Sequence, residues 1–262
     1  MIVFSAFVPH SPVIIPEVGK ENLDKLSDTI KAYQTLEHEI YSSKPDTIIV
    51  ISPHAEQRDE SFTINQAPNF KINFKEFGDL VTNMQFTNDI GFGYQVKELC
   101  EDYFPVMMTA QENLDYGTGV PLFYLTQHLP DVKVVVIGYS NLSPEEHFKF
   151  GQIIRKQINL AGKRIAVVAS GDLSHKLQED SPAGYSERAQ EFDQKIIKLI
   201  NNKKIDDIIH LDPELIKEVS PCGHRSLLIL LGIMEQLNFT PQQLSYQAPF
   251  GIGYLVENFE IK

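Results

Sequence analysis

Four short runs of apolar, mostly β-branched residues constrain the fold of this chain most. They lie at residues 2–8, 46–52, 132–138 and 164–170, and each has the length of a buried strand. Between the first two runs, within residues 23–40, apolar side chains recur at three- and four-residue steps, which is the spacing of one buried helical face. A strand, a helix and a second strand in this order predict a β-α-β unit with parallel strands.

The last two runs enclose a second predicted helix. Ser143 is the expected N-cap, because Glu146 three residues later completes a capping box, and Gly162 is the expected stop. Residues 186–202 and 223–236 are expected to form two more helices, and the second of these is strongly apolar. A second β-α-β unit is therefore predicted, with a deeply buried helix late in the chain.

Two other segments predict antiparallel strands. Pro68 and Asn69 separate two strand candidates within residues 61–77, so we expect a hairpin or an antiparallel edge there. Residues 242–261 resemble two strands joined by a Pro/Gly turn. We therefore predict an α/β fold, a three-layer sandwich with a central mixed, largely parallel sheet and helices on both faces, formed as a single domain over residues 1–262.

Charge and cysteine content argue against several classes of protein. The net charge of −12 opposes binding to a phosphate backbone or an anionic membrane, so we expect neither a nucleic-acid partner nor a membrane partner. No stretch approaches the roughly 18 uninterrupted apolar residues of a membrane span. Cys100 and Cys222 lie far apart and form no CxxC pair, which argues against a disulfide framework. We expect a soluble protein of the reducing cytoplasm.

Histidines follow three of the predicted strands. His10 and His54 each come directly after a proline at a strand end, and the segment SGDLSH, which contains Asp172 and His175, ends a third strand. A lone histidine is more often a surface or core residue, but ligands of parallel sheets bind at the carboxyl ends of strands, where these loops converge. Neutral imidazole binds zinc, iron and copper, so His10 and His54 are candidate metal ligands. Asp172 and His175 would serve as further ligands or as an acid/base pair.

Five motifs, in this order, carry a resemblance to a known family. They are PHSPVIIPEVG at 9–19, KPDTIIVISPHA at 44–55, LDYGTGVPLFYL at 114–125, SGDLSHKL at 170–177 and CGHRSLLILLG at 222–232. Together they resemble the class III extradiol ring-cleavage dioxygenase (LigB-like) superfamily over nearly the whole chain, and especially its Memo-like branch, which is associated with AMMECR1 and radical-SAM proteins. The resemblance implies a non-haem Fe(II) site, with Zn or Cu as alternatives, where a small aromatic substrate and dioxygen meet.

On this pattern, His10 and His54 match the two histidine ligands, and His175 matches the histidine that takes a proton from the substrate hydroxyl. The third ligand departs from the glutamate of the family. Glu218 is the nearest carboxylate, whereas Cys222 matches the Memo-like pattern, in which a cysteine joins two histidines. A thiolate favours Cu(I), Zn or an altered iron site. The helix that begins after Cys222 is expected to lower the pKa of this thiol.

A second departure lies at residues 115–117. Many extradiol dioxygenases carry Asp-His-Gly where this chain has Asp-Tyr-Gly, so Tyr116 would replace a histidine that contacts substrate or donates a proton. Its unperturbed pKa near 10 makes tyrosine a different acid. The alternative is that residues 114–117 form only the turn before a helix that starts near Val120.

Three functions therefore remain in competition. The first is an extradiol dioxygenase-like oxidoreductase that acts on a small aromatic, catechol-type substrate. The second is a Memo-like metal-binding protein of a multi-protein modification system, without ring-cleavage activity, which would work with an AMMECR1-like partner or as a homo-oligomer. The third is a metallohydrolase in which the same histidines hold the metal and His175 activates water. Zinc would favour the third function, and iron would not.

Overall fold

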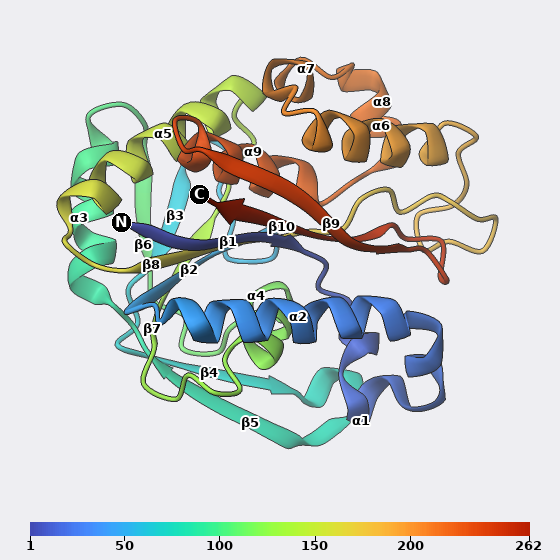
Figure 1. The fold of residues 1–262 in the computed structure, drawn as a ribbon, viewed down its shortest axis with the longest axis horizontal. Helices are drawn as coiled ribbons and strands as arrows, with labels where there is room; N and C mark the ends of the chain where they lie inside the picture. The colour runs from blue at the N-terminus through green and yellow to red at the C-terminus, as the bar shows by residue number, and fades with distance from the viewer.

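The computed structural model describes residues 1–262 and contains an eight-stranded sheet at its centre (Figure 1). The strand order is β6-β3-β7-β2-β8-β1-β10-β9, in which β3-β6 and the run β7-β2-β8-β1 pair parallel and the remaining neighbours pair antiparallel. The predicted mixed, largely parallel sheet is confirmed. The strands are β1 (Ile2–Val8), β2 (Thr47–Ser52), β3 (Phe62–Asn65), β6 (Val106–Thr109), β7 (Lys133–Gly138), β8 (Ile165–Ser170), β9 (Phe239–Gln247) and β10 (Tyr254–Ile261).

Helices cover both faces of the sheet and bury a separate hydrophobic cluster on each. One face carries α3, α5, α6 and α9, and the other carries α2, α4 and a two-stranded hairpin of β4 and β5 (Figure 1). The predicted α/β sandwich is therefore confirmed. The bounds are α1 (Pro16–Gly19), α2 (Ser27–Ser43), α3 (Ile90–Glu101), α4 (Tyr116–Leu125), α5 (Pro144–Leu160), α6 (Ala189–Asn201), α7 (Ile205–Ile209), α8 (Pro213–Val219), α9 (Gly223–Met234), β4 (Asn69–Phe74) and β5 (Asp79–Thr87), with short 3-10 helices at Pro12–Ile14, Lys20–Leu26 and Lys75–Phe77.

The predicted end signals of α5 are confirmed. The Ser143 side chain accepts a hydrogen bond from the Glu146 backbone N–H, and the Glu146 carboxylate accepts one from the Ser143 backbone N–H, which completes the capping box. At the other end, Gly162 has φ +64°, a left-handed conformation that glycine adopts without steric cost.

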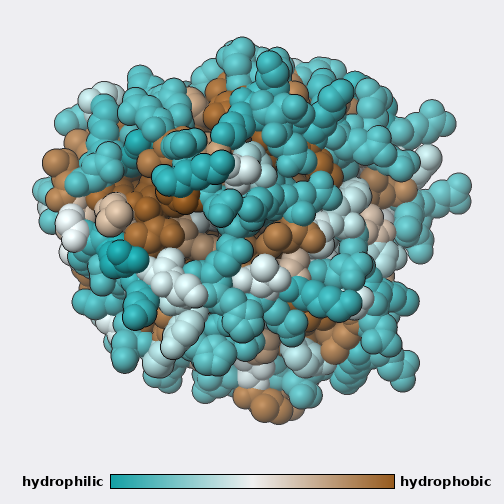
Figure 2. Space-filling view, viewed as in Figure 1, coloured by the Kyte–Doolittle hydropathy of each residue, from teal (hydrophilic) through white to brown (hydrophobic).

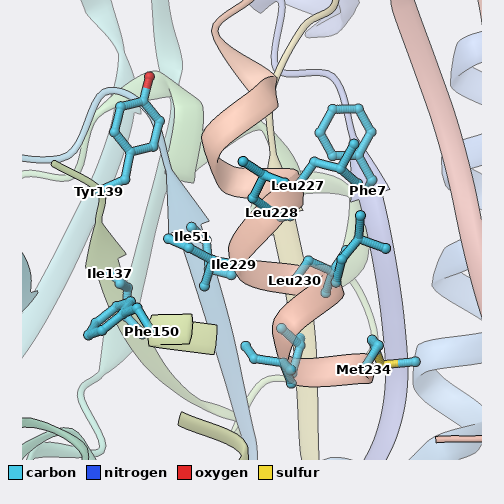
Figure 3. Packing of buried hydrophobic residues seen from close by; sticks show 14 of the residues in the cluster. Phe7, Ile51, Ile137, Tyr139, Phe150, Leu227, Leu228, Ile229, Leu230 and Met234 are labelled. Atoms are coloured by element: carbon cyan, nitrogen blue, oxygen red, sulfur yellow. The ribbon is translucent and has the colours of Figure 1, made fainter. Parts of the chain in front are cut away.

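Helix α9 is deeply buried, as the apolar sequence predicts. All of its residues except Arg225 are buried. Figure 3 shows its leucine and isoleucine side chains beside Phe7 of β1 and Ile51 of β2, and all of them belong to one hydrophobic cluster. On its other side, α9 packs closely on α5, because a Cβ at Gly232 would lie only 2.0 Å from the carbonyl oxygen of Phe148. The two backbones can approach this closely only where one helix has a glycine.

Residues 61–77 do not form the predicted hairpin. β3 joins the central sheet between β6 and β7, and β4 pairs with β5 in a separate hairpin. The chain passes from one face of the sheet to the other between β3 and β4, since Ile64 belongs to one hydrophobic cluster and Phe70 to the other. The side chain of Asn88 donates a hydrogen bond to the Ala67 carbonyl at 2.9 Å, so this crossing is held by a residue far along the chain. Both short strands find their partners elsewhere, which local alternation does not reveal.

Hydrophilic residues predominate on the face of the molecule shown in Figure 2, with hydrophobic residues in smaller groups between them. None of the helices combines the length and the apolar character that crossing a bilayer requires.

One buried carboxyl group lies within the central sheet. Glu257 of β10 is opposite Phe7 of β1, its side chain has 0% exposure, and neither carboxyl oxygen has a hydrogen-bond partner. Burial raises the pKa of Glu257 from an ordinary value of 4.5 to about 8. The folded protein therefore keeps this proton at a pH at which the unfolded chain has lost it.

This burial predicts a pH-dependent loss of stability. Between about pH 5 and about pH 8 the folded state binds more protons than the unfolded state, so the free energy of unfolding falls as pH rises. Glu257→Gln is expected to match the wild type near pH 5 and to exceed it by roughly 1–3 kcal/mol above pH 8, as measured by urea unfolding. Glu260→Gln, at an exposed position of the same strand, is the matched control. A difference in unfolding free energy between Glu257→Gln and the wild type that does not change with pH would contradict a protonated Glu257.

Candidate metal centre

Side chains from three neighbouring strands and two helices meet at one end of the sheet. β2, β8 and β1 lie side by side and parallel, and their carboxyl ends lead into His54, Asp172 and His10, respectively. Cys222 is the N-cap of α9, and Tyr116 is the first residue of α4. The structure thus gathers at one point the strand-end residues that sequence reasoning selected.

His10, His54 and Cys222 form a group whose ligand atoms all lie within 4.8 Å of one another. The His10 Nε2 atom lies 3.1 Å from His54 Nε2 and 3.6 Å from Cys222 Sγ. Around a tetrahedral ion with metal–nitrogen distances of about 2.0–2.1 Å and a metal–sulfur distance of about 2.3 Å, two nitrogens lie about 3.3 Å apart, and nitrogen and sulfur about 3.5 Å apart. The two distances from His10 Nε2 therefore fit ligands that share one metal ion.

The hydrogen bonds around the two histidines bring their Nε2 atoms together. The Ser170 hydroxyl donates to the Gly117 carbonyl, so it accepts a hydrogen bond from His10 Nδ1, at 2.9 Å, and the Nε2 atom of His10 carries a lone pair. His10 Nε2 can therefore accept a hydrogen bond from His54 Nε2–H at 3.1 Å, and the Tyr116 hydroxyl lies 2.9 Å from the same His54 nitrogen. A metal ion that replaced the proton between the two rings would be bound by both Nε2 atoms.

Burial keeps both of these imidazoles uncharged. It lowers the pKa of His10 to about 3 and that of His54 to about 4, although the nearby Asp115 opposes both shifts. His10 is only 2% exposed. At neutral pH both rings are therefore uncharged, which is the state in which imidazole binds a metal ion.

The thiol of Cys222 differs from the sequence expectation. Burial raises the pKa of Cys222 well above its ordinary value, and the negative charge of Asp172 adds to this rise. The predicted lowering by the helix end is therefore wrong for the protein without a metal, because the cost of removing a thiolate from water exceeds the effect of the helix dipole. The sulfur still accepts a hydrogen bond from the Asp172 backbone N–H at 3.1 Å, which fixes its position. A cation beside the sulfur would favour the thiolate.

Asp172 and His175 form an adjoining pair. One carboxyl oxygen of Asp172 accepts a hydrogen bond from the His10 backbone N–H at 3.2 Å, and the other lies 3.9 Å from His175 Nε2. Burial raises the pKa of Asp172, which is 4% exposed, to about 6, and His175 opposes this rise. His175 Nδ1 donates to the Ser220 carbonyl at 2.7 Å, so its Nε2 atom carries a lone pair. His175 is therefore arranged to accept a proton.

Asp172 and His175 also belong, with Cys222, to a second group of ligand-type atoms within 4.8 Å of one another. This group shares Cys222 with the first group and adds Asp172 and His175. His175 is therefore a candidate for metal ligation as well as for proton transfer.

Glu218 lies apart from these groups. Its carboxylate accepts hydrogen bonds from the Ser186 hydroxyl and from Arg188, the latter at 3.1 Å. Neither group of ligand-type atoms includes Glu218. The structure thus brings a thiol rather than this carboxylate to the two histidines.

Helix α4 begins at Tyr116, not near Val120, so residues 114–117 are more than a preceding turn. Asp115 is the N-cap, and its side chain accepts a hydrogen bond from the Thr118 backbone N–H at 2.9 Å. This cap orients the first turn so that the Tyr116 hydroxyl reaches His54. Burial raises the pKa of Tyr116 to about 12, so the phenol stays protonated and can donate.

Sequence reasoning missed the glycines that let these segments approach each other. A Cβ at Gly171 would lie 2.1 Å from the Cα atom of Gly223, so the loop after β8 and the start of α9 touch backbone to backbone. A Cβ at Gly117 would lie 2.7 Å from Ser52 Oγ and 3.0 Å from the ring of His54. The only signal in the sequence is that each glycine directly adjoins a residue with a chemical role.

Gly171→Ala is expected to disrupt this contact. The new methyl group would meet backbone that cannot rotate away, so we expect a loss of more than about 2 kcal/mol in unfolding free energy together with weaker metal binding. Gly91→Ala, whose added Cβ meets nothing within 4 Å, is the control and is expected to leave both quantities unchanged. Thermal unfolding and metal titration of the two variants test this prediction. Equal stability and equal metal affinity in Gly171→Ala and Gly91→Ala would refute the close contact.

Comparisons with known proteins agree with this arrangement at the level of the fold and the family. The sequence model of a family described as "Catalytic LigB subunit of aromatic ring-opening dioxygenase" matches residues 5–257. The crystal structure of the uncharacterized protein JW3007 from Escherichia coli K12 superimposes with a TM-score of 0.71 at 16% identity, over 98% of this chain and 99% of that one. This second likeness concerns the fold alone.

Three curated proteins are similar in sequence. Protein CA_C1420 of Clostridium acetobutylicum is 28% identical over 97% of this chain, and the chain spans only 56% of that relative's length. The 3,4-dihydroxyphenylacetate 2,3-dioxygenase of Escherichia coli is 22% identical over 81% of this chain and 82% of its own. The 2-aminophenol 1,6-dioxygenase beta subunit of a Pseudomonas species is 23% identical over 82% and 80%, respectively.

Proposed function

Because the chain belongs to the family of catalytic LigB subunits of aromatic ring-opening dioxygenases, we propose that it is a non-haem, metal-dependent oxidoreductase that acts on a small, catechol-type aromatic substrate with dioxygen. Two relatives, at 22% and 23% identity, are named as dioxygenases of 3,4-dihydroxyphenylacetate and 2-aminophenol. The observation that carries the proposal is the meeting of three ligand-type atoms: His10 Nε2 lies 3.1 Å from His54 Nε2 and 3.6 Å from Cys222 Sγ.

In this proposal, His10 and His54 hold the metal, and Cys222 lies beside it as the third member of the group. Fe(II) is the metal we propose, with Zn or Cu as alternatives. Fe(II) would supply open positions at which a catechol and dioxygen are held side by side.

The residues around this group are suited to move protons. His175 Nε2 carries a lone pair that would take a proton from a substrate hydroxyl, and Asp172, 3.9 Å away, would stabilise the imidazolium that results. The Tyr116 hydroxyl remains protonated at neutral pH and would donate a hydrogen bond to the substrate once a metal has replaced it at His54. These assignments give His175 the role of base and Tyr116 that of donor.

A second candidate is a Memo-like metal-binding protein that works with an AMMECR1-like partner and does not cleave rings. The observation that favours it is the thiol of Cys222 beside the two histidines, at a place where the family pattern has a carboxylate. The nearest alternative carboxylate, Glu218, is held by Ser186 and Arg188. Thiolate ligands favour Cu(I) and Zn over iron.

Elemental analysis of the protein purified without oxygen separates the two candidates. If the dioxygenase proposal holds, we expect stoichiometric iron that survives in Cys222→Ala, and consumption of dioxygen when catechols are added. Copper, or a metal that leaves with Cys222, would favour the Memo-like function. Zinc without oxygen consumption would favour a metallohydrolase. An absence of metal in the wild type, even after anaerobic incubation with Fe(II), would refute the metal centre.

A further inference from the structure

A small hollow lies at the far end of α9 from the metal centre. Its volume is about 280 Å³, and α5 and α9 form its walls. Gly232, which lines it, lies roughly 15 Å along the helix axis from Cys222. The lining residues that bear on its chemistry are Tyr103, Lys149, Gln152, Arg155, Lys156 and Glu235. The hollow is therefore separate from the proposed metal ligands.

The charge in this hollow is opposite to that of the whole chain. Three cationic side chains line it, Lys149, Arg155 and Lys156, together with one carboxylate, Glu235. Glu235 accepts a hydrogen bond from Gln152 at 2.7 Å, so it is already engaged. The chain as a whole carries a net charge of −12. Like charges held close together repel each other unless an anion lies between them.

The two lysines share one aromatic ring. The Lys149 ammonium group lies 5.8 Å from the centre of the Tyr103 ring, and the Lys156 ammonium group lies 5.4 Å from it. These cation–π contacts hold two flexible side chains on the rim of the hollow. Both ammonium groups keep hydrogen-bond donors free for a ligand.

Arg155 is the cationic group of the hollow that the protein leaves without a partner. No ion pair engages its half-buried guanidinium group, and its Nη1 atom is buried and has no hydrogen-bond partner. Because Nη1 is closed off from solvent, a ligand would meet the other nitrogens of the fork. A buried N–H donor without an acceptor costs free energy, and more so when the group is charged. The fork of N–H donors on a guanidinium group matches the oxygens of a phosphate, to which it binds in a bidentate manner.

We propose that this hollow binds a phosphate-bearing small molecule. Arg155 holds two phosphate oxygens, Lys149 and Lys156 neutralise the remaining charge from the rim, and the Tyr103 ring borders the attached group. The volume suits a phosphate group with a small substituent, since pockets for larger ligands measure about 300–1,000 Å³. The site is independent of the proposed dioxygenase chemistry, so either proposal can fail without the other.

Calorimetric titration of the full chain with inorganic pyrophosphate at low salt tests the site. We expect saturable binding by the wild type, weakened at least about tenfold in Arg155→Gln, because the bidentate contact is lost. Lys195→Gln removes one positive charge at an exposed position of α6 and is the matched control, with unchanged affinity. Malonate, a dianion without phosphate geometry, is expected to bind more weakly than pyrophosphate.

Two further variants guard against a folding defect. Arg155→Lys keeps the charge and loses the fork, so its affinity is expected to fall between those of the wild type and Arg155→Gln. Lys156→Gln changes an exposed rim residue and is expected to weaken binding about threefold with unchanged thermal unfolding. The proposal is overturned if the wild type shows no saturable binding, if Lys195→Gln loses as much affinity as Arg155→Gln, or if malonate binds as tightly as pyrophosphate.

Discussion

His10→Ala is expected to weaken Fe(II) binding by at least about 100-fold while leaving the fold intact. The Nε2 atom of His10 is the central atom of the proposed ligand group, because it lies 3.1 Å from His54 Nε2 and 3.6 Å from Cys222 Sγ. Its ring is fixed from the other side by the hydrogen bond to Ser170. Metal analysis and competition with a chelator, both under anaerobic conditions, measure the effect.

His147→Ala is the matched control for this experiment. His147 is also a buried histidine with a pKa lowered by burial, to about 4, but its two ring nitrogens lie 2.7 Å and 3.2 Å from the backbone carbonyls of Ser143 and Ser140 rather than beside other ligand-type atoms. We expect this variant to keep its metal and to lose thermal stability. Stoichiometric metal that remains in both His10→Ala and His54→Ala would contradict the site.

His175→Ala is expected to keep the metal and to lose turnover by about 10²- to 10⁴-fold, the contribution that a positioned general base makes. The Nε2 atom of His175 faces Asp172 at 3.9 Å, and its other nitrogen is held by the Ser220 carbonyl. Oxygen consumption with the best catechol measures turnover, and elemental analysis of the same sample measures metal. Both measurements are needed, because His175 also belongs to the second ligand-type group.

Glu179→Ala, at an exposed position on the same loop, is the control and is expected to change neither quantity. A loss of metal in His175→Ala would make His175 a ligand and would remove its role as base. Unchanged turnover on a metal-loaded variant would also exclude that role.

Local sequence patterns were sufficient to predict most of the architecture. The strand runs and the Ser143 capping box involve residues within a few positions of each other, so both elements can be predicted from one segment of sequence. The strands at residues 61–77 could not be paired in this way. β3 pairs with β6 and β7, both far along the chain, and β4 turns to β5 instead of to its near neighbour. Which strands pair depends on segments that are far apart in the sequence, so it cannot be read from one segment alone.

The same distinction between local and long-range features applies to the candidate site. The rule that ligands gather at strand ends was enough to select His10 and His54, because it depends only on where strands stop. The contact between Gly171 and Gly223 depends on the approach of two segments that share no local pattern. The pKa of Cys222 was predicted to fall but is raised, for a related reason. The helix end after Cys222 can be read from the local sequence, whereas the burial that raises the pKa depends on the whole fold.

The glycines of α9 have a consequence for how a metal would bind. Gly223 fixes one end of the helix against the loop after β8, Gly232 fixes the other against α5, and only Arg225 among its residues is not buried. The helix therefore cannot slide to adjust the position of Cys222 without disturbing the core. The proposed centre would therefore be preorganised: the candidate donor atoms are already held in place, so metal binding would not have to overcome the entropy of ordering a loop.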